Sequence, residues 1–249
     1  MDLYRRHLLD IKGGLELEHD ESLPPCPLCG APAFKGKDFT FPHLIEHDCD
    51  CNFQRPEEYQ RGLRKAWRLY RAPRLLLEDL RNHPRYREYL DIPVQGHRGN
   101  EEAMRVLKAY QGGLLYLFGP PGTGKTHLAL RLARRLAEEG KFIRFRTELE
   151  FLEEERRASL EGQDPPLYER LVLDDLGKGR PTPFALERLY ALVEGAYVGR
   201  YDLILTSNFS PEDLKARLGE VGEAIASRIM GGKTVEVRGG DWRRKGGTG

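Results

Sequence analysis

The sequence predicts an α/β protein whose main domain is a parallel β-sheet sandwiched by helices. Two observations predict it. From Glu101 onward, short apolar stretches alternate with longer stretches of helical periodicity, as expected of strands joined by crossover helices. In addition, the first apolar stretch, Leu114–Phe118, runs into a glycine-rich segment, residues 119–126, that opens the next helical pattern. Parallel sheets place their ligand-binding loops at such junctions of strand and helix.

The individual elements follow from apolar spacing and from helix-breaking residues. The helix predicted over 126–139 places Leu128, Leu132 and Leu136 on one face and stops at Gly140. Strands are predicted over 114–118, 142–145, 171–173, 203–206 and 233–237, with helices over 101–110 and between most of the strands. Residues 57–90 are predicted to be helical with breaks at Pro73 and Pro84.

Length and composition bound the organisation. The 249 residues are enough for one mid-sized domain and a smaller module. We expect an N-terminal module over 1–56, a helical linker over 57–100 and the α/β domain over 101–249. The net charge of +1 excludes a uniformly basic nucleic-acid binder. No apolar run approaches the roughly 20 residues of a membrane helix, and no secretory signal precedes the module, so a cytoplasmic protein without a membrane partner is expected.

Residues 119–126 match the pattern G-x-x-x-x-G-K-[ST] in full. Such glycines let the backbone wrap phosphate groups with its N–H groups pointing inward, and the helix N-terminus adds positive potential. Lys125 is expected to reach the β- and γ-phosphates, and the Thr126 hydroxyl to hold Mg²⁺. A chance glycine-rich turn is the weaker alternative, because a strand precedes the motif and a helix follows it. The predicted nucleotide contacts are Gly119, Pro120, Pro121, Gly122, Thr123, Gly124, Lys125, Thr126 and His127.

Two further strand ends carry polar residues that suit this site. The strand over 171–173 delivers Asp174 and Asp175 at its carboxyl end, where open parallel sheets bind ligands. We expect Asp174 to orient Mg²⁺ through its water shell and Asp175 to polarise the attacking water; an Asp pair that caps a turn is the alternative. After the strand over 203–206, Asn208 can donate and accept hydrogen bonds and so sense the γ-phosphate, although an ordinary turn would also place it there.

All four cysteines lie close together, as C-x₂-C followed by C-x-C. In a reducing compartment this clustering indicates metal ligation rather than disulfides. Four thiolates suit a tetrahedral, structural Zn²⁺, which would supply much of the folding energy of so small a module. His43 or His47 in place of one cysteine, an iron–sulfur cluster and free thiols remain as alternatives. The predicted zinc ligands are Cys26, Cys29, Cys49 and Cys51.

Basic residues recur at spacings of three and four in the predicted linker helix. Such a stripe can contact DNA or an acidic partner. A solvated helix face is the favoured alternative, because arginine is also a good helix former. The residues are Arg61, Arg64, Lys65, Arg68 and Arg71.

These motifs resemble the AAA+ helicase loaders of bacteria and their phages, the DnaC/DnaI-like family, with the IstB-like transposition ATPases as close relatives. The matching segments are GPPGTGKTHLA, LVLDDLG, Gly-Arg-Tyr at 199–201, LTSN, and Ala-Ser-Arg-Ile at 226–229. Asp-Asp-Leu-Gly, in place of the Asp-Glu of most AAA+ enzymes, marks this branch. The resemblance covers roughly residues 84–245.

The resemblance implies an AAA+ P-loop fold that binds and hydrolyses ATP with Mg²⁺. It gives Lys125 and Thr126 the Walker A roles, Asp174 and Asp175 the Walker B roles, and Asn208 the role of sensor 1.

Further implied roles concern arginines and assembly. Arg228 matches an arginine finger that completes the ATP site of a neighbouring subunit, which implies self-association in the ATP-bound state. Arg243 is similar to the sensor 2 arginine, although Arg244 follows it directly. A solvated surface charge is the alternative for Arg228 and Arg243. Because so few residues follow Arg243, no C-terminal helical lid domain is expected.

The family also suggests partners. DnaI-type loaders use a similar N-terminal zinc module to engage the replicative hexameric helicase, and their AAA+ domain binds single-stranded DNA. Arg144, Arg146, Arg156 and Arg157 lie where such loaders contact the strand. The implied function is ATP-dependent loading of the helicase in bacterial or phage replication. The alternatives are an IstB-like regulator of DNA transposition and a nucleotide-dependent clamp whose ATPase is nearly silent.

Overall fold

The computed structural model describes residues 17–19, 21–36, 46–91 and 100–239. These residues form two compact units, one up to Arg71 and one from Ala72 onward. The boundary falls within helix α3 (Pro56–Asp79), so residues 57–71 belong to the first unit. Across the described ranges, no helix is long and apolar enough to cross a membrane.

The first unit contains a small antiparallel sheet. Its strands are β1 (Leu17–His19), β2 (Ala33–Gly36) and β3 (Glu46–His47), in that order, and the short helix α2 (Cys51–Gln54) precedes α3. The core is small because Pro, Gly and Cys dominate the loops. Its buried residues are Leu23, Cys26, Ala33, Cys51, Tyr59 and Leu63.

The second unit is built on a five-stranded parallel sheet, as predicted. Its strands are β4 (Leu114–Phe118), β5 (Arg144–Thr147), β6 (Arg170–Leu176), β7 (Asp202–Ser207) and β8 (Lys233–Glu236). The spatial order is β5-β6-β7-β4-β8, and every neighbouring pair is parallel. Since β7 lies between β4 and β6, the carboxyl ends of these three strands meet at one edge of the sheet.

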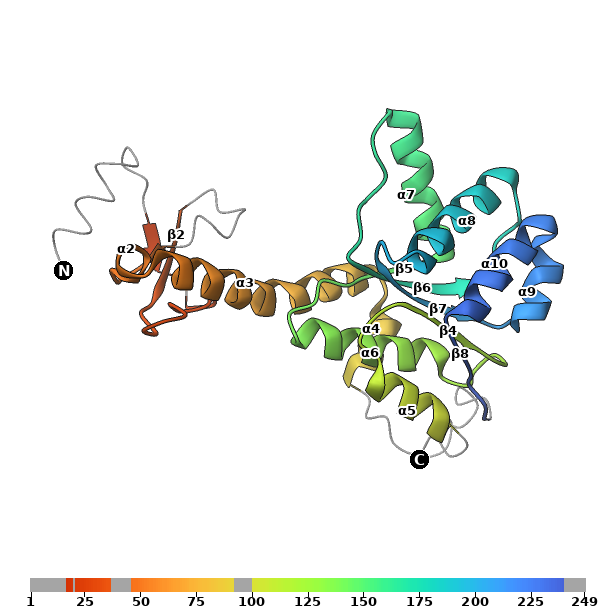
Figure 1. Ribbon diagram of the computed structural model, residues 1–249, viewed down its shortest axis with the longest axis horizontal. Coiled ribbons are helices and arrows are strands. Elements are labelled where there is room, and N and C mark those ends of the chain that lie inside the picture. The colour runs from red at the N-terminus through yellow and green to blue at the C-terminus, as the bar shows by residue number, and fades with distance from the viewer. Residues whose placement is uncertain (1–16, 20, 37–45, 92–99, 240–249) are drawn as a thin grey trace. The chain divides into compact units, whose positions relative to one another are not determined.

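Helices cover both faces of this sheet (Figure 1). Alternate residues of β4 point to opposite sides: Leu115 and Leu117 join the core under α4, α5 and α6, whereas Leu114 and Tyr116 join the core under α8, α9 and α10. The helical elements are η2 (Leu80–Asn82), α4 (Pro84–Asp91), α5 (Glu101–Ala109), α6 (Lys125–Glu138), α7 (Glu148–Glu161), α8 (Pro183–Tyr197), α9 (Pro211–Leu218) and α10 (Glu220–Gly231). The predicted helix–sheet–helix sandwich is therefore confirmed.

Several predicted boundaries were wrong; β6, for example, runs to Leu176 instead of ending at residue 173. Helix α3 does not break at Pro73 but runs through it to Asp79, because burial of Ala72, Leu76 and other residues of its apolar side outweighs the loss of one backbone hydrogen bond. Strand β5 ends two residues later than predicted, at Thr147, because its backbone stays paired with β6 as far as Asp174. Of the described residues, only 237–239 follow β8.

Candidate functional site

The predicted phosphate loop connects β4 to α6 and is shaped by its glycines. Gly119, Gly122 and Gly124 all have positive φ, between 80° and 147°. A Cβ atom on Gly119 would lie 2.2 Å from the carbonyl oxygen of Val237, so no other residue fits there. Lys125 begins α6, and its Nζ donates to the carbonyls of Gly119 and Pro120, both at 2.8 Å. The loop therefore folds around its own lysine.

The Asp174 carboxylate is the polar centre of the site. Asp174 is completely buried at the end of β6. Its Oδ1 accepts hydrogen bonds from the hydroxyls of Thr126, at 2.8 Å, and Thr206, at 2.5 Å. Its Oδ2 is buried without a hydrogen-bond partner among the described residues. Burial raises the pKa of Asp174, and the neighbouring charge of Asp175 adds to this, while the nearby hydroxyls of Thr206, Thr126 and Tyr86 oppose it.

This arrangement fits Mg²⁺. The donors are hard oxygens, a carboxylate and a hydroxyl from Thr126, which this cation prefers. An orphaned buried oxygen such as Oδ2 of Asp174 is costly unless a cation or proton compensates it. Thr126 lies in the first turn of α6 and Asp174 lies near the end of β6, and the structure brings them into direct contact. Both residues that the sequence predicts for magnesium are thus in contact, and their binding of one ion stays a prediction.

Asp175 adopts an unusual backbone conformation. Asp174 and Asp175 together face Thr206 across a β-bulge between β6 and β7. Asp175 has φ of 63°, and it is the one non-glycine residue with positive φ in the described chain. Its N–H donates to Thr206 Oγ1 at 3.1 Å, and its Oδ2 accepts from Lys178 Nζ at 2.8 Å. The two neighbouring carboxylates have different partners, the hydroxyls of Thr126 and Thr206 for Asp174 and the ammonium group of Lys178 for Asp175.

Thr206 is a site residue that the sequence analysis missed. It contacts both aspartates, whereas Asn208 lies one residue beyond β7 and its side chain is exposed. A signal was present, since Thr206 is the first polar residue after the apolar run of residues 203–205 in β7. The role of Asn208 in sensing nucleotide stays a prediction.

A cavity of about 580 Å³ opens beside Asp175. Glu148, Lys178 and Phe184 are among its lining residues, and Tyr86 of α4 borders it as well. Burial and the charges of the two aspartates raise the pKa of Tyr86. The predicted water-activating carboxylate therefore faces a space large enough for solvent or for part of a ligand.

Arg228 lies away from these residues, on the surface formed by α8 and α10. Its guanidinium forms an ion pair with Glu194, donates to the Tyr190 hydroxyl at 2.9 Å, and lies 4.9 Å from the centre of that ring. The hydrogen bond to Glu194 raises its pKa. Arg228 contacts neither the phosphate loop nor the two aspartates within the described residues, and its role as an arginine finger stays a prediction. Arg243 and Arg244 lie outside the described residues.

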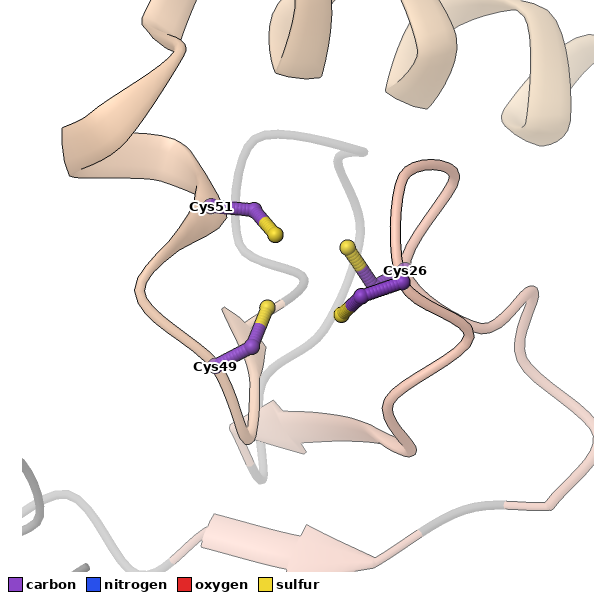
Figure 2. Close-up of side chains that lie close together, drawn as sticks. Cys26, Cys49 and Cys51 are labelled. Atoms are coloured by element: carbon purple, nitrogen blue, oxygen red, sulfur yellow. The ribbon is translucent and has the colours of Figure 1, made fainter.

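The four cysteines of the first unit converge, and Figure 2 labels three of them, Cys26, Cys49 and Cys51. The four sulfur atoms all lie within 4.8 Å of one another, close to the spacing of roughly 3.8 Å that four Zn–S bonds of about 2.3 Å would give. Cys26 and Gly30 form a tight turn, in which the Gly30 N–H donates to the Cys26 carbonyl at 2.9 Å. Burial and the neighbouring thiols raise the pKa of Cys49. The donor set fits zinc.

The structure bears on whether His47 replaces one of the cysteines as a zinc ligand. His47 Nδ1 lies 2.6 Å from the Tyr59 hydroxyl, and Nε2 lies 3.1 Å from the Pro24 carbonyl oxygen. Both ring nitrogens are therefore engaged within the module, which favours a structural role for His47. His43 lies outside the described residues.

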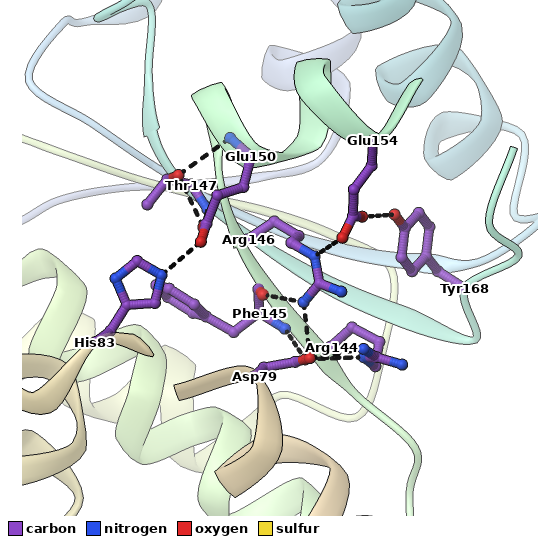
Figure 3. Close-up of polar contacts among 9 residues, drawn as sticks. All are labelled: Asp79, His83, Arg144, Phe145, Arg146, Thr147, Glu150, Glu154 and Tyr168. Carbon is purple, nitrogen blue, oxygen red and sulfur yellow. Dashed lines mark hydrogen bonds and ion pairs between the residues drawn. The ribbon is translucent and has the colours of Figure 1, made fainter. Parts of the chain in front are cut away.

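Two of the four arginines predicted to contact single-stranded DNA are paired with acids (Figure 3). Arg144 and Arg146 form ion pairs with Asp79, at 2.7 and 2.8 Å, and Arg146 also reaches Glu154 at 2.7 Å. The Asp79 side chain is only 3% exposed. This pairing favours a structural role for both arginines. Arg156 instead lies over the Phe184 ring, at 5.6 Å, and Arg157 is exposed.

The basic stripe on α3 is partly exposed. Arg61, Arg64 and Lys65 are exposed, whereas Arg68 and Arg71 are half-buried. The exposed part of the stripe is therefore smaller than the spacing of its five residues predicts.

Comparisons with known proteins match the second unit. A family model described as IstB-like ATP binding protein matches residues 111–247. The chain is 32% identical over 136 residues to a protein of Mycobacterium tuberculosis described as ATP-binding in an insertion sequence, covering 51% of this chain and 53% of that one. It is 30% identical over 143 residues to the replicative helicase loader DnaI of Bacillus subtilis, covering 50% and 45%.

The chain thus spans about half the length of the curated relatives it matches. Among solved structures, AMPPCP-bound DnaA from Aquifex aeolicus aligns with a TM-score of 0.50 at 21% identity, covering 60% of this chain and 49% of that one. At this identity the likeness concerns the fold.

Proposed function

The chain belongs to the IstB-like ATP binding protein family and has the AAA+ P-loop fold, and on this premise we propose that it is an ATP-dependent loader of the replicative DNA helicase. It would bind and hydrolyse ATP and place the hexameric helicase on single-stranded DNA at the start of bacterial or phage replication. One observation carries the ATP-dependent part. Thr126 and Thr206 converge on Asp174 behind the phosphate loop and leave one buried carboxylate oxygen for a cation.

Nucleotide binding would begin with an exchange of hydrogen bonds at Lys125. Its ammonium group now contacts two neutral carbonyls of its own loop, and phosphate oxygens are stronger acceptors because they are charged. Backbone N–H groups of residues 122–124 and the N-terminus of α6 supply further donors. Thr126 and Asp174 would hold Mg²⁺, which neutralises charge on the phosphates.

Hydrolysis would depend on Asp175 and on a second subunit. Asp175 borders the cavity, and Lys178 holds one of its oxygens, so its carboxylate can orient a water against the γ-phosphate. Arg228 would exchange Glu194 for the γ-phosphate of a neighbouring subunit, as an arginine finger does. Hydrolysis would then require self-association in the ATP-bound state.

The choice of partner rests on the first unit. The loader DnaI and the insertion-sequence protein match this chain equally well, and over a similar length. A regulator of DNA transposition is therefore the second candidate, favoured by the insertion-sequence relative. The cysteine module favours the loader, because it offers a separate metal-stapled surface for the helicase.

Co-purification with the replicative hexameric helicase of the same cell tests this proposal. Wild type and a Glu57→Gln control, changed at an exposed position of α3, should retain the helicase with Mg-ATP present at micromolar concentrations. A Cys26→Ser/Cys29→Ser variant should lose it. If wild type forms no complex under these conditions, the loader proposal is wrong, and duplex DNA with a transposase is the next partner to test.

A further inference from the structure

The loop that follows β6, residues 177–179, is held from both sides by side chains that the proposed chemistry does not use. Glu148 approaches from the start of α7, and Arg217 approaches from α9. Glu148 binds N–H groups of the loop, and Arg217 binds its carbonyl groups. Neither residue was singled out by any motif in the sequence.

Glu148 is a buried carboxylate, with 4% of its surface exposed. Its Oε2 accepts hydrogen bonds from the N–H groups of Gly177, at 2.6 Å, and Lys178, at 3.2 Å. Burial raises the pKa of Glu148, and these backbone donors oppose the shift. A Cβ atom on Gly179 would lie 2.6 Å from Oε1, so a larger residue there would displace this carboxylate. Buried charges are rare unless they have such partners.

Arg217 binds the same loop from the opposite side. Its Nε donates to the Gly177 carbonyl at 2.6 Å, and its Nη2 donates to the Gly179 carbonyl at 3.1 Å. The guanidinium lies 5.6 Å from the centre of the Phe209 ring, which limits its freedom. Donors and acceptors of the same short loop are thus satisfied by two side chains of opposite charge.

The loop in turn fixes Asp175. A non-glycine residue with φ of 63° occupies a sparsely populated conformation, which persists only where the surroundings determine it. The Lys178 N–H donates to the Asp175 carbonyl at 3.2 Å, and the Lys178 side chain holds the Asp175 carboxylate at 2.8 Å. The position of Lys178 depends on Glu148, which binds its N–H group.

From this geometry we infer that Glu148 and Arg217 are positioning residues for Asp175: they hold residues 177–179 so that the Asp175 carboxylate stays aimed at the attacking water. The inference rests on the proposed hydrolysis of ATP at this site. Neither residue needs to touch nucleotide, so their loss should slow turnover while leaving nucleotide binding intact. Misplacement of a reacting group by about 1 Å can cost on the order of a hundredfold in rate.

The test compares Glu148→Ala, Glu148→Gln and Arg217→Gln in the full chain. Glu161→Gln is the matched control, because it removes an exposed charge at the other end of the same helix. Steady-state turnover of ATP gives kcat, binding of a fluorescent nucleotide gives Kd, and thermal unfolding reports the fold. We expect kcat to fall between about tenfold and a hundredfold in Glu148→Ala, and about tenfold in Arg217→Gln. Glu148→Gln keeps one acceptor oxygen and should lose less than Glu148→Ala.

Two further results are expected if both residues act through one loop. The nucleotide Kd should stay within about twofold of wild type, and the double variant Glu148→Ala/Arg217→Gln should lose no more than the worse single variant. If Glu148→Ala fails to fold, Arg217→Gln tests the positioning role by itself, because Arg217 is exposed and its replacement should leave the fold intact.

The variant Asp175→Asn distinguishes a failure of the proposed hydrolysis from a failure of the positioning role. Equal turnover in wild type and Asp175→Asn would overturn the proposed hydrolysis itself. An inactive Asp175→Asn beside unchanged kcat in folded Glu148→Ala and Arg217→Gln would overturn the positioning role alone. A loss of kcat matched by an equal loss of nucleotide binding would also overturn it, because that pattern belongs to a general structural defect.

Discussion

The cysteine cluster and the Asp174 centre are both predicted to hold a metal ion, but they are built in opposite ways. The cysteines lie in a module whose described core has six buried residues, two of them predicted zinc ligands. Asp174 lies in a domain with an extensive apolar core on each face of its sheet. The first site should therefore need its metal to fold, whereas the second folds first and then offers its ligands.

The largest expected effect follows from this difference. Cys26→Ser/Cys29→Ser should unfold the first unit, because structural zinc supplies on the order of 10 kcal/mol of folding free energy to such small modules. Nucleotide binding by the second unit should persist. Zinc content by elemental analysis and limited proteolysis with ATP present would show both results. If proteolysis left the module intact after the metal was lost, its small core would suffice, and the contrast between the two sites would disappear.

A smaller effect is expected where the second unit is stabilised by charge rather than by metal. Asp79→Asn leaves Arg144 and Arg146 without their shared, buried partner (Figure 3). Removing one member of a buried ion pair costs about 3 kcal/mol or more. Urea denaturation should show this loss for Asp79→Asn, whereas Glu88→Gln, at an exposed position of α4, should lie within about 0.5 kcal/mol of wild type. Equal stabilities would mean that the network around Asp79 contributes little.

The smallest expected effect is a gain in stability rather than a loss. Burial raises the pKa of Asp174, so the folded protein without metal keeps a proton on Asp174 that the unfolded chain has already released. Wild type therefore loses stability as pH rises from the usual Asp pKa through the raised one. Asp174→Asn should escape this loss and be more stable at neutral pH, by about 1 kcal/mol.

Thermal unfolding without nucleotide, measured against pH, checks this prediction. The advantage of Asp174→Asn should grow as pH rises and should vanish at low pH. Stabilisation by Mg-ATP should be lost in the variant. An advantage that is constant across pH would mean that the carboxylate charge is not its cause.

Local patterns in the sequence were enough to predict the sheet, the phosphate loop and the convergence of the four cysteines. The sheet and the loop depend on strong apolar periodicity and on residues close together in the chain, and the cysteines converge because their residue type and paired spacing favour one metal ion. The positions of Thr206, Glu148 and Arg217 could not be predicted, because each contacts residues 29 to 40 positions away. The pairing of Asp79 with Arg144 spans 65 positions and was missed for the same reason.

Single-turnover hydrolysis of ATP by wild type and by Asp175→Asn, both saturated with Mg-ATP, tests the central claim most directly. Both proteins should bind nucleotide, because Asp175 is not among the residues placed on the phosphates. Wild type should hydrolyse it, and Asp175→Asn should be slower by at least about a hundredfold, as expected when the group that activates water is lost. Equal rates in the two proteins, or no hydrolysis by wild type under conditions of self-association, would contradict the assignment of this site as an ATPase centre.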